Sequence, residues 1–522
     1  MQIYSSYESS RFSHERCWSI KDPPRLILVG AGSRGTSLAR AVVHATNGHL
    51  AAVADPNPYR RRQLGRQYIW GVESAKEGEE FTDWVEFREW EVERRKRESA
   101  GENVGKGVDG VVVCVMDSLH REVLEGLAPL GLHVMCEKPL ATSLDDCVGI
   151  YESVLGEKSV LFAIGHVMRY SPQNMLLKKL VEDEAVGDVV SIEHTENVGW
   201  WHFAHSYVRG NWRKTSTSGP TLLTKSCHDI DFLMWLMCNS QRNKQPHLPS
   251  TVASFGSLRQ FRRARKPVEA GNATNCMSCP IENSCHYSAQ KIYWEQGIMA
   301  GLGGWPVDVV VPDIEDLLDE GGLKGAREGL NRKLAEDYTE DTPAAEVEGR
   351  QWYGRCVFES DNDVCDDQTV NINWDDDPLP NAGLKGRGMK SATFHMTAFT
   401  QGVCTKRTRV FGTKGEIEAS GKSVKVHDFI SGETKEHPPM LTAGGHSGGD
   451  HGLMAQFVLA IDAIKNKSMS IEEAQNQYIG CTPADIFRSH AMVFAAEDAR
   501  TTRRIVDWNE WWKDNVKSES LR

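Results

Sequence analysis

The chain has 522 residues, of which 40% are hydrophobic and 25% are charged, and its 60 basic against 72 acidic residues give a formal net charge of -12. This length predicts at least two domains and a large buried core. The acidic balance argues against a broad nucleic-acid-binding surface, which needs a basic excess. No apolar run is long enough to predict a membrane span.

Residues 1–24 are polar and lack the apolar middle of a secretory signal, so we expect a flexible N-terminal extension. The 13 cysteines are odd in number and spread along the chain, which is typical of a protein in a reducing compartment. We therefore expect a cytoplasmic protein that binds neither membrane nor nucleic acid.

Short apolar runs alternate with helical patterns between residue 25 and about residue 155. The runs cover residues 26–29, 50–54, 111–115 and 133–136. Continuous apolar strands separated by helices predict an α/β domain with a parallel sheet covered on both faces. Residues 86–107 carry charges of both signs and predict a solvated helix and loop inserted in this unit.

A glycine motif, Gly30-x-Gly32-x-x-Gly35, follows the first apolar run and opens a helix, and Asp55 ends the second run. This combination predicts a Rossmann domain, in which glycines let the pyrophosphate of a dinucleotide approach the helix N-terminus. Asp55 suits the adenosine ribose and favours NAD. Nearby basic side chains leave NADP open, namely Arg34, Arg60 and Arg61.

After about residue 155 the pattern becomes alternating, in residues 189–195, 392–399 and 408–411. Alternation predicts half-exposed, mostly antiparallel strands. Residues 308–348 are acidic and helical in pattern, and a final helical zone runs from 451 to 499. We therefore expect a Rossmann domain at 25–155 and a substrate-binding and oligomerisation α/β domain at 156–510, with a cysteine-rich loop inserted at about 260–350.

Two further motifs carry candidate chemistry. Glu137-Lys138-Pro139 follows the fourth apolar run, at the sheet edge where doubly wound folds bind ligands. Thr224, Lys225 and His228 precede an apolar helix, and they share one side if they are helical themselves. A neutral histidine suits removal of a hydroxyl proton near pH 7. A histidine satisfied within the core is the alternative.

The glycine motif with Asp55, the tripeptide at Lys138 and His228-x-x-Asp231, in this order, resemble the Gfo/Idh/MocA oxidoreductase family, which includes glucose-fructose oxidoreductase and inositol dehydrogenases. The resemblance spans about residues 25–499. It implies a Rossmann domain and an α/β domain whose large, mostly antiparallel sheet forms a homo-oligomer interface. It also implies NAD(P)-dependent oxidation or reduction of a hydroxyl of a sugar, polyol or sugar-acid derivative.

The resemblance and the chemistry of the residues together give roles for individual residues. His228 is the expected acid/base, Lys138 orients the substrate, and Lys225 joins them as a catalytic residue. The cofactor set comprises Gly30, Gly32, Ser33, Arg34, Gly35, Asp55, Asp117, His120, Glu137 and Lys138. The substrate set comprises His166, Arg169, Tyr170, Trp200, His205 and Arg209. In this set aromatic rings stack on sugar faces and Arg209 binds a carboxylate, with simple aromatic packing as the alternative.

One position departs from the family pattern. Many dehydrogenases of the family have Asp four residues before the histidine, where this chain has Thr224. The threonine hydroxyl cannot hold negative charge, and the adjacent Lys225 is expected to lower the pKa of His228 by like-charge repulsion. Two alternatives therefore stay open, namely a redox-assisted, NAD-dependent glycoside-cleaving enzyme and a non-catalytic dinucleotide-binding regulator.

Cys276-x2-Cys279 and the following Cys285 have the spacing of metal ligands. We expect a structural zinc site with Cys356 as the fourth ligand, and His286 and Cys365 are alternatives for that position. An iron–sulfur cluster and free thiols are the competing interpretations. Farther along, Asp450 is expected to cap the N-terminus of the last helical zone.

Overall fold

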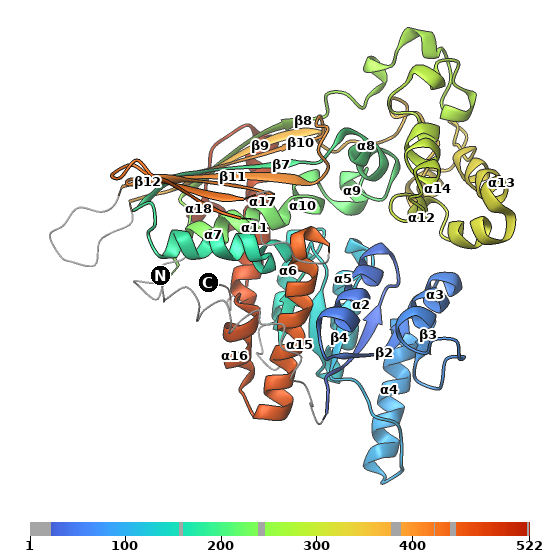
Figure 1. Ribbon diagram of the computed structural model, residues 1–522, viewed down its shortest axis with the longest axis horizontal. Helices are drawn as coiled ribbons and strands as arrows, with labels where there is room; N and C mark the ends of the chain where they lie inside the picture. The colour runs from blue at the N-terminus through green and yellow to red at the C-terminus, as the bar shows by residue number, and fades with distance from the viewer. Residues whose placement is uncertain are drawn as a thin grey trace.

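The computed structural model describes residues 22–155, 160–238, 246–376, 388–421, 423–438, 445–518 and 521. The expected extension lies outside the described residues except for positions 22–24. Two sheets organise the described chain, one in the N-terminal third and a larger one beyond it (Figure 1).

The first sheet has the strand order β3-β2-β1-β4-β5-β6, and every neighbouring pair is parallel. Its strands are β1 Arg25–Val29, β2 His49–Ala54, β3 Glu80–Phe81, β4 Gly110–Val113, β5 His133–Cys136 and β6 Phe162–Ile164. Its helices are α2 Ser33–Ala45, α3 Pro58–Tyr68, α4 Trp84–Ser99, α5 His120–Leu127 and α6 Leu144–Ile150. The predicted parallel sheet is confirmed. The strand formed by the third apolar run, residues 111–115, ends at Val113.

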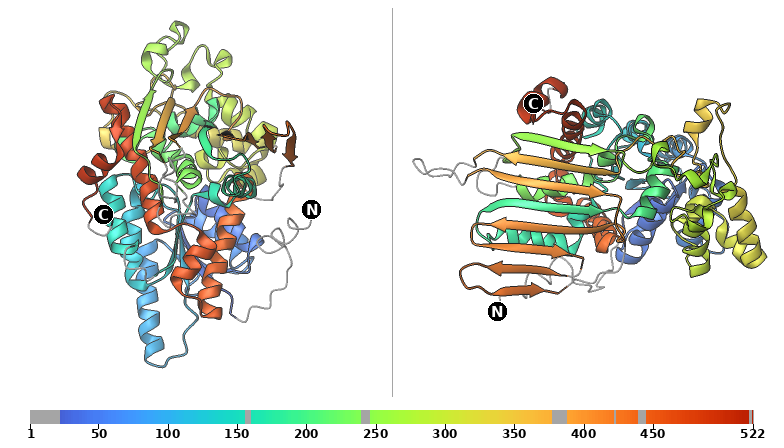
Figure 2. Two further views of the ribbon diagram at one scale, coloured as in Figure 1. Left: turned by 90° about the vertical axis from the view of Figure 1, so that its left-hand side faces the viewer. Right: turned by 90° about the horizontal axis from the view of Figure 1, so that it is seen from above.

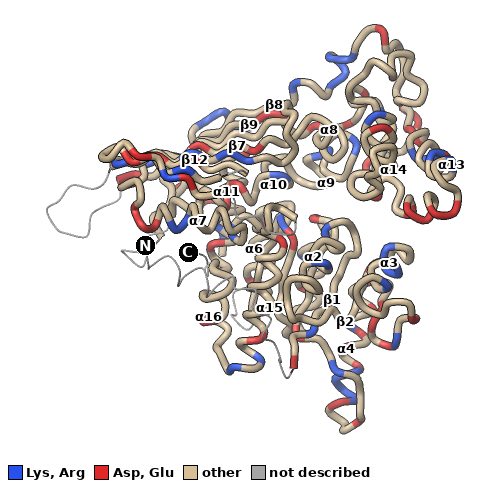
Figure 3. The backbone as a smooth tube through the Cα atoms, in the orientation of Figure 1, with Lys and Arg blue, Asp and Glu red and all other residues tan. Residues whose placement is uncertain are grey.

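The charged insertion is α4 followed by a loop, as expected, although it is not wholly solvated. Glu91 and Arg94 are buried, and Arg94 Nε donates to Glu91 Oε2 at 2.8 Å. The two charges compensate each other against the sheet. Figure 3 shows charges of both signs along α4.

The second sheet has nine strands in the order β14-β13-β12-β11-β7-β10-β9-β8-β15. Only β7 and β10 are parallel neighbours among the described pairs. The strands are β7 Val189–Asn197, β8 Thr251–Ser257, β9 Asp367–Trp374, β10 Lys390–Thr397, β11 Thr405–Gly412, β12 Gly415–Ser420, β13 Val424–Asp428, β14 Thr434–His437 and β15 Val506–Asp507.

Alternation along these strands buries one face of the sheet. In β10 the side chains of Ala392, Phe394 and Met396 are fully buried, and the residues between them are partly exposed. Helices α11 Cys227–Met237 and α17 Pro483–Thr502 pack on the buried side. The view from above in Figure 2 shows the opposite face without helices in front of it.

The chain between β8 and β9, residues 258–366, forms what we call the inserted lobe, at one end of the large sheet (Figure 1). Its first part consists of short 3-10 turns and a π-helical turn at Gln290–Glu295, and its second part contains α12 Val307–Val310, α13 Ile314–Leu334 and α14 Ala344–Gly349. The expected helical insertion is therefore present.

The remaining helices lie outside the segments of the chain that form the first sheet and the inserted lobe. α15 Gly449–Lys467 packs on α2, so a C-terminal helix covers the N-terminal sheet. The others are α7 Pro172–Glu182, α8 Trp200–Phe203, α9 Thr215–Ser218, α10 Thr221–Thr224, α16 Ile471–Ala474 and α18 Trp508–Asn515. Among the described helices, none combines the length and apolar character that crossing a membrane requires.

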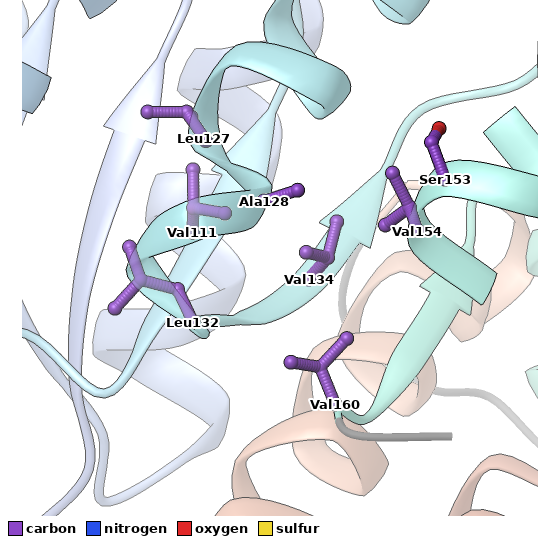
Figure 4. Close-up of a pocket in the computed structure, with 8 residues that line it drawn as sticks. All are labelled: Val111, Leu127, Ala128, Leu132, Val134, Ser153, Val154 and Val160. Atoms are coloured by element: carbon purple, nitrogen blue, oxygen red, sulfur yellow. The ribbon is translucent and has the colours of Figure 1, made fainter. Parts of the chain in front are cut away.

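A small apolar pocket lies at the side of the first sheet (Figure 4). Its lining is Val111, Leu127, Ala128, Leu132, Ser153, Val154, Val134 and Val160. With one serine and no ionisable group, this pocket lacks the chemistry of an active site.

We predict that stability falls as the pH drops from about 6.5, because several buried histidines stay neutral in the folded state. Burial lowers the pKa of His205 and of His490 from 6.5 to about 3. The unfolded chain takes up these protons between the two values while the folded chain does not. Each such histidine therefore removes up to about 1.4 kcal/mol of stability per pH unit across this range.

Urea denaturation at about pH 7 and about pH 5 measures this dependence. His490 Nε2 accepts from Leu140 N at 2.8 Å, and its Nδ1 lies 2.8 Å from Ile486 O. The H490Q variant should therefore be less stable at neutral pH and less sensitive to acid. An unfolding free energy that is flat between the two pH values would contradict the assignment of neutral buried rings.

Candidate active site

The glycine motif lies at the carboxyl end of β1 and leads into α2. Gly30 has φ +99, and a Cβ there would lie 2.5 Å from Cys114 O. A Cβ on Gly35 would lie 1.9 Å from Gly30 O. Gly32 is different, because its nearest neighbour would be Arg60 Nη1 at 4.0 Å, which leaves open space at the helix N-cap.

Asp55 fixes the loop from the end of β2. Its Oδ2 accepts from Ala31 N at 2.6 Å, and its Oδ1 accepts from Asn57 N at 2.7 Å. The first turn of α2 has no acidic residue and no side-chain cap, so its amides are not satisfied by a side chain. An open cradle, free helix amides and a fixed carboxylate fit a dinucleotide.

The Arg34 side chain has partners within the protein. Its Nη2 lies 2.6 Å from Glu137 Oε1 and 2.9 Å from Asp450 Oδ1. This ion-pair network joins α2 to the turn after β5 and to the first turn of α15. Arg34 therefore has a structural role in this arrangement. The N-cap of α15 is Gly448, so the expectation that Asp450 caps this helix is wrong.

The turn after β5 carries Lys138 towards the second domain. Lys138 Nζ donates to the carbonyl of Thr224 and lies 5.7 Å from the centre of the Trp212 ring. Pro139 O lies 2.7 Å from His120 Nδ1, so His120 supports this turn. Trp212 Nε1 donates to Asp117 Oδ2 at 2.9 Å. Asp117 thus contacts the second domain through Trp212, and His120 holds the Lys138 turn.

Thr224, Lys225 and His228 do not share one continuous helix, so that expectation is corrected. α10 ends at Thr224, and α11 begins at Cys227 after a turn at Lys225 and Ser226. The break turns the Thr224 carbonyl to Lys138, while the Thr224 hydroxyl bonds back to Pro220 O at 3.3 Å.

His228 is buried in the first turn of α11, with a free imidazole edge. Its Nε2 lies 3.4 Å from Asp229 Oδ2, and neither ring nitrogen makes a well-directed hydrogen bond to the described protein. Burial, helped by the charges of Lys406 and Lys138, lowers the pKa of His228 to about 3. The ring is therefore neutral near pH 7.

Lys225 does not act on His228 as expected from the sequence. Its Nζ lies 2.8 Å from Glu196 Oε1, and this pairing overcomes burial and raises the pKa of Lys225. Lys406 also pairs with Glu196 and lies 3.8 Å from Asp229 Oδ1. The predicted direction of the His228 shift stands, but its causes are burial and two other lysines.

Sequence reasoning missed Glu196, Lys406 and Asp229. Glu196 continues the buried phase of β7, after Ile192 and His194, and Lys406 shares the phase of buried Thr408 in β11. A charged residue at an inward-facing position of an alternating strand is the signal that would have found both.

The expected substrate residues fall into two groups. His166, Arg169 and Tyr170 are buried behind α11 with partners of their own. Arg169 donates to both oxygens of Asp231 at 2.7 and 2.8 Å, and His166 Nδ1 lies 3.1 Å from Asp231 Oδ1. Tyr170 OH donates to Ile479 O at 3.0 Å. These contacts give the three residues a structural role.

Trp200, His205 and Arg209 contact the inserted lobe. Arg209 is 1% exposed, and it donates to Arg355 O at 2.7 Å and Tyr287 O at 2.8 Å. This placement corrects the expectation that Arg209 binds a substrate carboxylate. The His205 ring stacks on Tyr353, and Trp200 meets Tyr287 edge-on.

A part of this aromatic cluster does reach the charged groups of the site. Trp305 of the lobe meets the His202 ring edge-on at 4.9 Å. His202 Nδ1 lies 3.4 Å from Cys404 Sγ, which is itself 3.3 Å from Lys225 Nζ. The lobe therefore forms a wall next to Lys225.

Comparisons with known proteins agree with this arrangement. Residues 25–166 match the family model described as "Oxidoreductase family, NAD-binding Rossmann fold", and residues 178–263 match "Oxidoreductase family, C-terminal alpha/beta domain". Among solved structures, a levoglucosan dehydrogenase in complex with NADH is 16% identical with a TM-score of 0.56, over 93% of this chain and 99% of the other. This likeness supports the fold.

Curated relatives are more similar over shorter segments. A 2,7-anhydro-N-acetylneuraminate hydratase of Mediterraneibacter gnavus is 31% identical over 40% of this chain and 48% of its own length. Inositol 2-dehydrogenase 2 of Saccharopolyspora erythraea is 27% identical over 27% of this chain and 39% of its own length. A putative oxidoreductase of Bacillus subtilis, YteT, is 22% identical over 68% of this chain and 73% of its own length. The matches to the hydratase and the inositol dehydrogenase thus cover less than half of those proteins.

Two glycine variants test whether the loop is a dinucleotide cradle. G32A places its Cβ in open space, so the free energy of unfolding should change by less than about 0.5 kcal/mol. Dinucleotide binding should nevertheless weaken at least about tenfold, since the methyl group would occupy the path of the pyrophosphate. Calorimetric titration and thermal unfolding give both quantities.

G35A is the matched comparison, because its Cβ would overlap Gly30 O. We expect it to lower stability as well as binding. Unchanged dinucleotide affinity in folded G32A would argue against the cradle.

Proposed function

Since the chain belongs to the Gfo/Idh/MocA oxidoreductase family, we propose that it transfers hydride between NAD and a hydroxyl-bearing carbon of a sugar, polyol or sugar-acid derivative. The observation that carries this proposal is the neutral imidazole of His228, with Asp229 Oδ2 at 3.4 Å from its Nε2, in the same buried site as Lys138. Relatives named inositol and levoglucosan dehydrogenases support the substrate class.

NAD, when bound, supplies the hydride acceptor for oxidation of the alcohol carbon. The residues suited to hold it are Gly30, Gly32 and Gly35 with the N-terminus of α2 for the pyrophosphate, and Asp55 for the adenosine ribose. The fixed carboxylate of Asp55 favours a free 2'-hydroxyl over a 2'-phosphate, because like charges repel.

His228 takes the hydroxyl proton in this proposal. Its ring is neutral near pH 7, and Asp229 stabilises the imidazolium that forms after proton uptake. Asp229 is held by His194, whose Nε2 lies 3.0 Å from Asp229 Oδ1 and whose Nδ1 lies 2.8 Å from Thr408 Oγ1. Asp229 and His194 are therefore positioning residues for His228.

Lys138 orients the substrate oxygen and stabilises its developing negative charge. The Thr224 carbonyl and the Trp212 ring fix the position of its ammonium group. This group has three N–H donors, so it can still donate hydrogen bonds to a ligand. Lys225 adds positive charge that Glu196 partly compensates, and this charge favours a substrate with an acidic group.

The test is a screen of sugars, polyols and sugar acids with NAD or NADP, followed by the near-ultraviolet absorbance of the reduced nicotinamide. For an active substrate, H228Q should lower kcat by about 10²- to 10⁴-fold. K138M should lower kcat/KM by a similar factor, because its neutral side chain cannot stabilise alkoxide charge. H44Q, at an exposed position near the end of α2, is the control that should keep full activity.

Equal activity of H228Q and the unaltered protein would contradict the acid/base role. Tight dinucleotide binding without turnover of any substrate would instead favour the regulator of the same fold.

A second candidate is redox-assisted cleavage or hydration without net oxidation. It is supported by Thr224 at the position where many family dehydrogenases have Asp, and by the relatives named hydratases. Such an enzyme would release product from a glycoside or anhydro sugar without accumulating reduced nicotinamide. Product analysis by mass spectrometry alongside the absorbance assay distinguishes the two reactions.

Cofactor preference is a separate prediction. Arg60 lies next to the Gly32 cradle, and Arg61 donates to Asp55 O and pairs with Glu80. D55S removes the carboxylate that repels a 2'-phosphate and keeps these arginines. We expect the ratio of kcat/KM for NAD over NADP to fall at least about tenfold, which corresponds to about 1.4 kcal/mol. An unchanged ratio would show that Asp55 does not select the cofactor.

We also propose that the chain forms a homo-oligomer through the outer face of the nine-stranded sheet. This face is free of helices in Figure 2, and Phe255, which is out of phase with the buried Val252 and Ser254 of β8, is exposed on it. Light scattering on F255D beside the unaltered protein measures whether the assembly depends on this face.

A further inference from the structure

Four cysteines of the inserted lobe lie outside the chemistry proposed above. Cys276, Cys279 and Cys285 occur on consecutive turns near the start of the lobe. An isolated bridge between Asn275 and Arg355 brings the distant Cys356 to them, with Cys276 N donating to Gly354 O and Cys356 N to Thr274 O, both at 2.8 Å. The fold therefore gathers the four thiols from two segments.

Their sulfur atoms are set among N–H donors. Cys276 Sγ accepts from Arg209 Nη2 at 3.4 Å and from Ala289 N at 3.5 Å. The backbone amide of Tyr287 donates to Cys285, and that of Phe358 donates to Cys356, in each case two residues further along. N–H donors of this kind commonly hydrogen-bond to metal-bound side chains and orient them.

We propose that Cys276, Cys279, Cys285 and Cys356 together bind one structural zinc ion that fastens the two segments of the inserted lobe. Binding releases the thiol protons to solvent and forms four zinc–sulfur bonds. No three of these four sulfur atoms all lie within 4.8 Å of one another, so side-chain rotation draws them onto the ion.

The structure separates Cys356 from the other candidates for the fourth ligand. The Cys365 carbonyl accepts from Thr221 Oγ1, and its thiol faces Arg500 and Glu497 of α17. The His286 ring packs edge-on against Trp200 and lies tilted against Tyr287. Neither shares the bridge at Asn275 that places Cys356.

Two other groups of ligand-type atoms are closer together, but their surroundings do not suit a cation. Glu196, His228 and Asp229 lie beside the ammonium groups of Lys225 and Lys406. In the group of His166, Cys227 and His490, His490 already accepts from Leu140 N and His166 pairs with Asp231. The cysteine cluster has Arg209 beside it instead, which offsets the negative charge of a four-thiolate site.

The first part of the lobe consists of short turns of 3-10 and π type, and the rings of Phe261, Tyr287 and Tyr293 are buried there. The bridge between Asn275 and Arg355 joins this part to the segment of Cys356, and a bound metal would fasten the same two segments. Arg209 connects this cluster to the aromatic wall, since it contacts Cys276, Tyr287 and Arg355 together. The ion would thus hold the wall beside the candidate active site.

The protein is expressed without a tag in a medium that contains both zinc and iron. Its metal content is then measured by plasma mass spectrometry. We expect about one zinc per chain, released by an organomercurial reagent that blocks thiols. C285S and C356S should lose the zinc, and C365S should retain it.

Cobalt replacement tests the same site without a variant, so a folding failure of C285S or C356S does not decide the outcome. The cobalt protein should show the visible and thiolate charge-transfer absorption of a tetrahedral sulfur site. Iron with a cluster spectrum, disulfides among these cysteines in mass spectra, or metal-free protein would each overturn the zinc assignment. Zinc retained by folded C356S would overturn the choice of ligand.

Zinc content is measured independently of turnover. A failure of the zinc proposal can therefore be distinguished from a failure of the proposed oxidoreductase activity. If both hold, chelation of the zinc should raise KM for the substrate, because Trp305 of the lobe reaches Lys225 through His202 and Cys404.

Discussion

The arrangement of the candidate active site depends on the buried carboxylate of Asp231. Arg169 binds both of its oxygens, His166 Nδ1 lies 3.1 Å from Oδ1, and Ser489 Oγ donates to it at 2.7 Å. These partners come from the turn after β6 and from α17, while Asp231 belongs to α11. A buried charge requires such partners, and removing one typically costs 3–5 kcal/mol. The pair therefore holds α11, and with it His228, against the edge of the parallel sheet.

A second ion-pair network fixes the glycine motif and the Lys138 turn, on the other side of the candidate active site. Arg34, in the first turn of α2, bridges Glu137 and Asp450. Glu137 Oε2 also accepts from the amide of Lys138. The helix that begins at the glycine motif is thus tied to the lysine turn and to α15. Dinucleotide and substrate groups are positioned by connected contacts rather than by separate loops.

Much of the fold could be predicted because it depends on local patterns. Continuous apolar runs mark a sheet buried on both faces, alternation marks the half-exposed sheet, and the glycine spacing with Asp55 specifies a known turn. The outlines of the site followed from Lys138 and His228. The turn at Ser226 between two helices was not visible, because Thr224, Lys225 and His228 fit one helical face equally well on paper.

Long-range partners account for the other differences. Arg209 is polar and follows aromatic residues, which suits a ligand pocket, yet its acceptors are Tyr287 and Arg355 in the inserted lobe. Proximity in sequence suggests that Lys225 acts on His228, but Lys225 forms an ion pair with Glu196 of β7. A single sequence contains no record of which distant strand supplies a counter-charge, so these assignments needed the tertiary structure.

The position of β7 in the large sheet also bears on how the chain is made. β7 lies between β10 and β11, and the whole inserted lobe, with β8 and β9, separates it from these two strands along the chain. A ribosome must therefore release the lobe before β7 finds either neighbour, and α15 must emerge before α2 is covered. β7 therefore stays without either neighbouring strand until residues 390–412 have been synthesised, so the large sheet can close only after β10 and β11 have both left the ribosome.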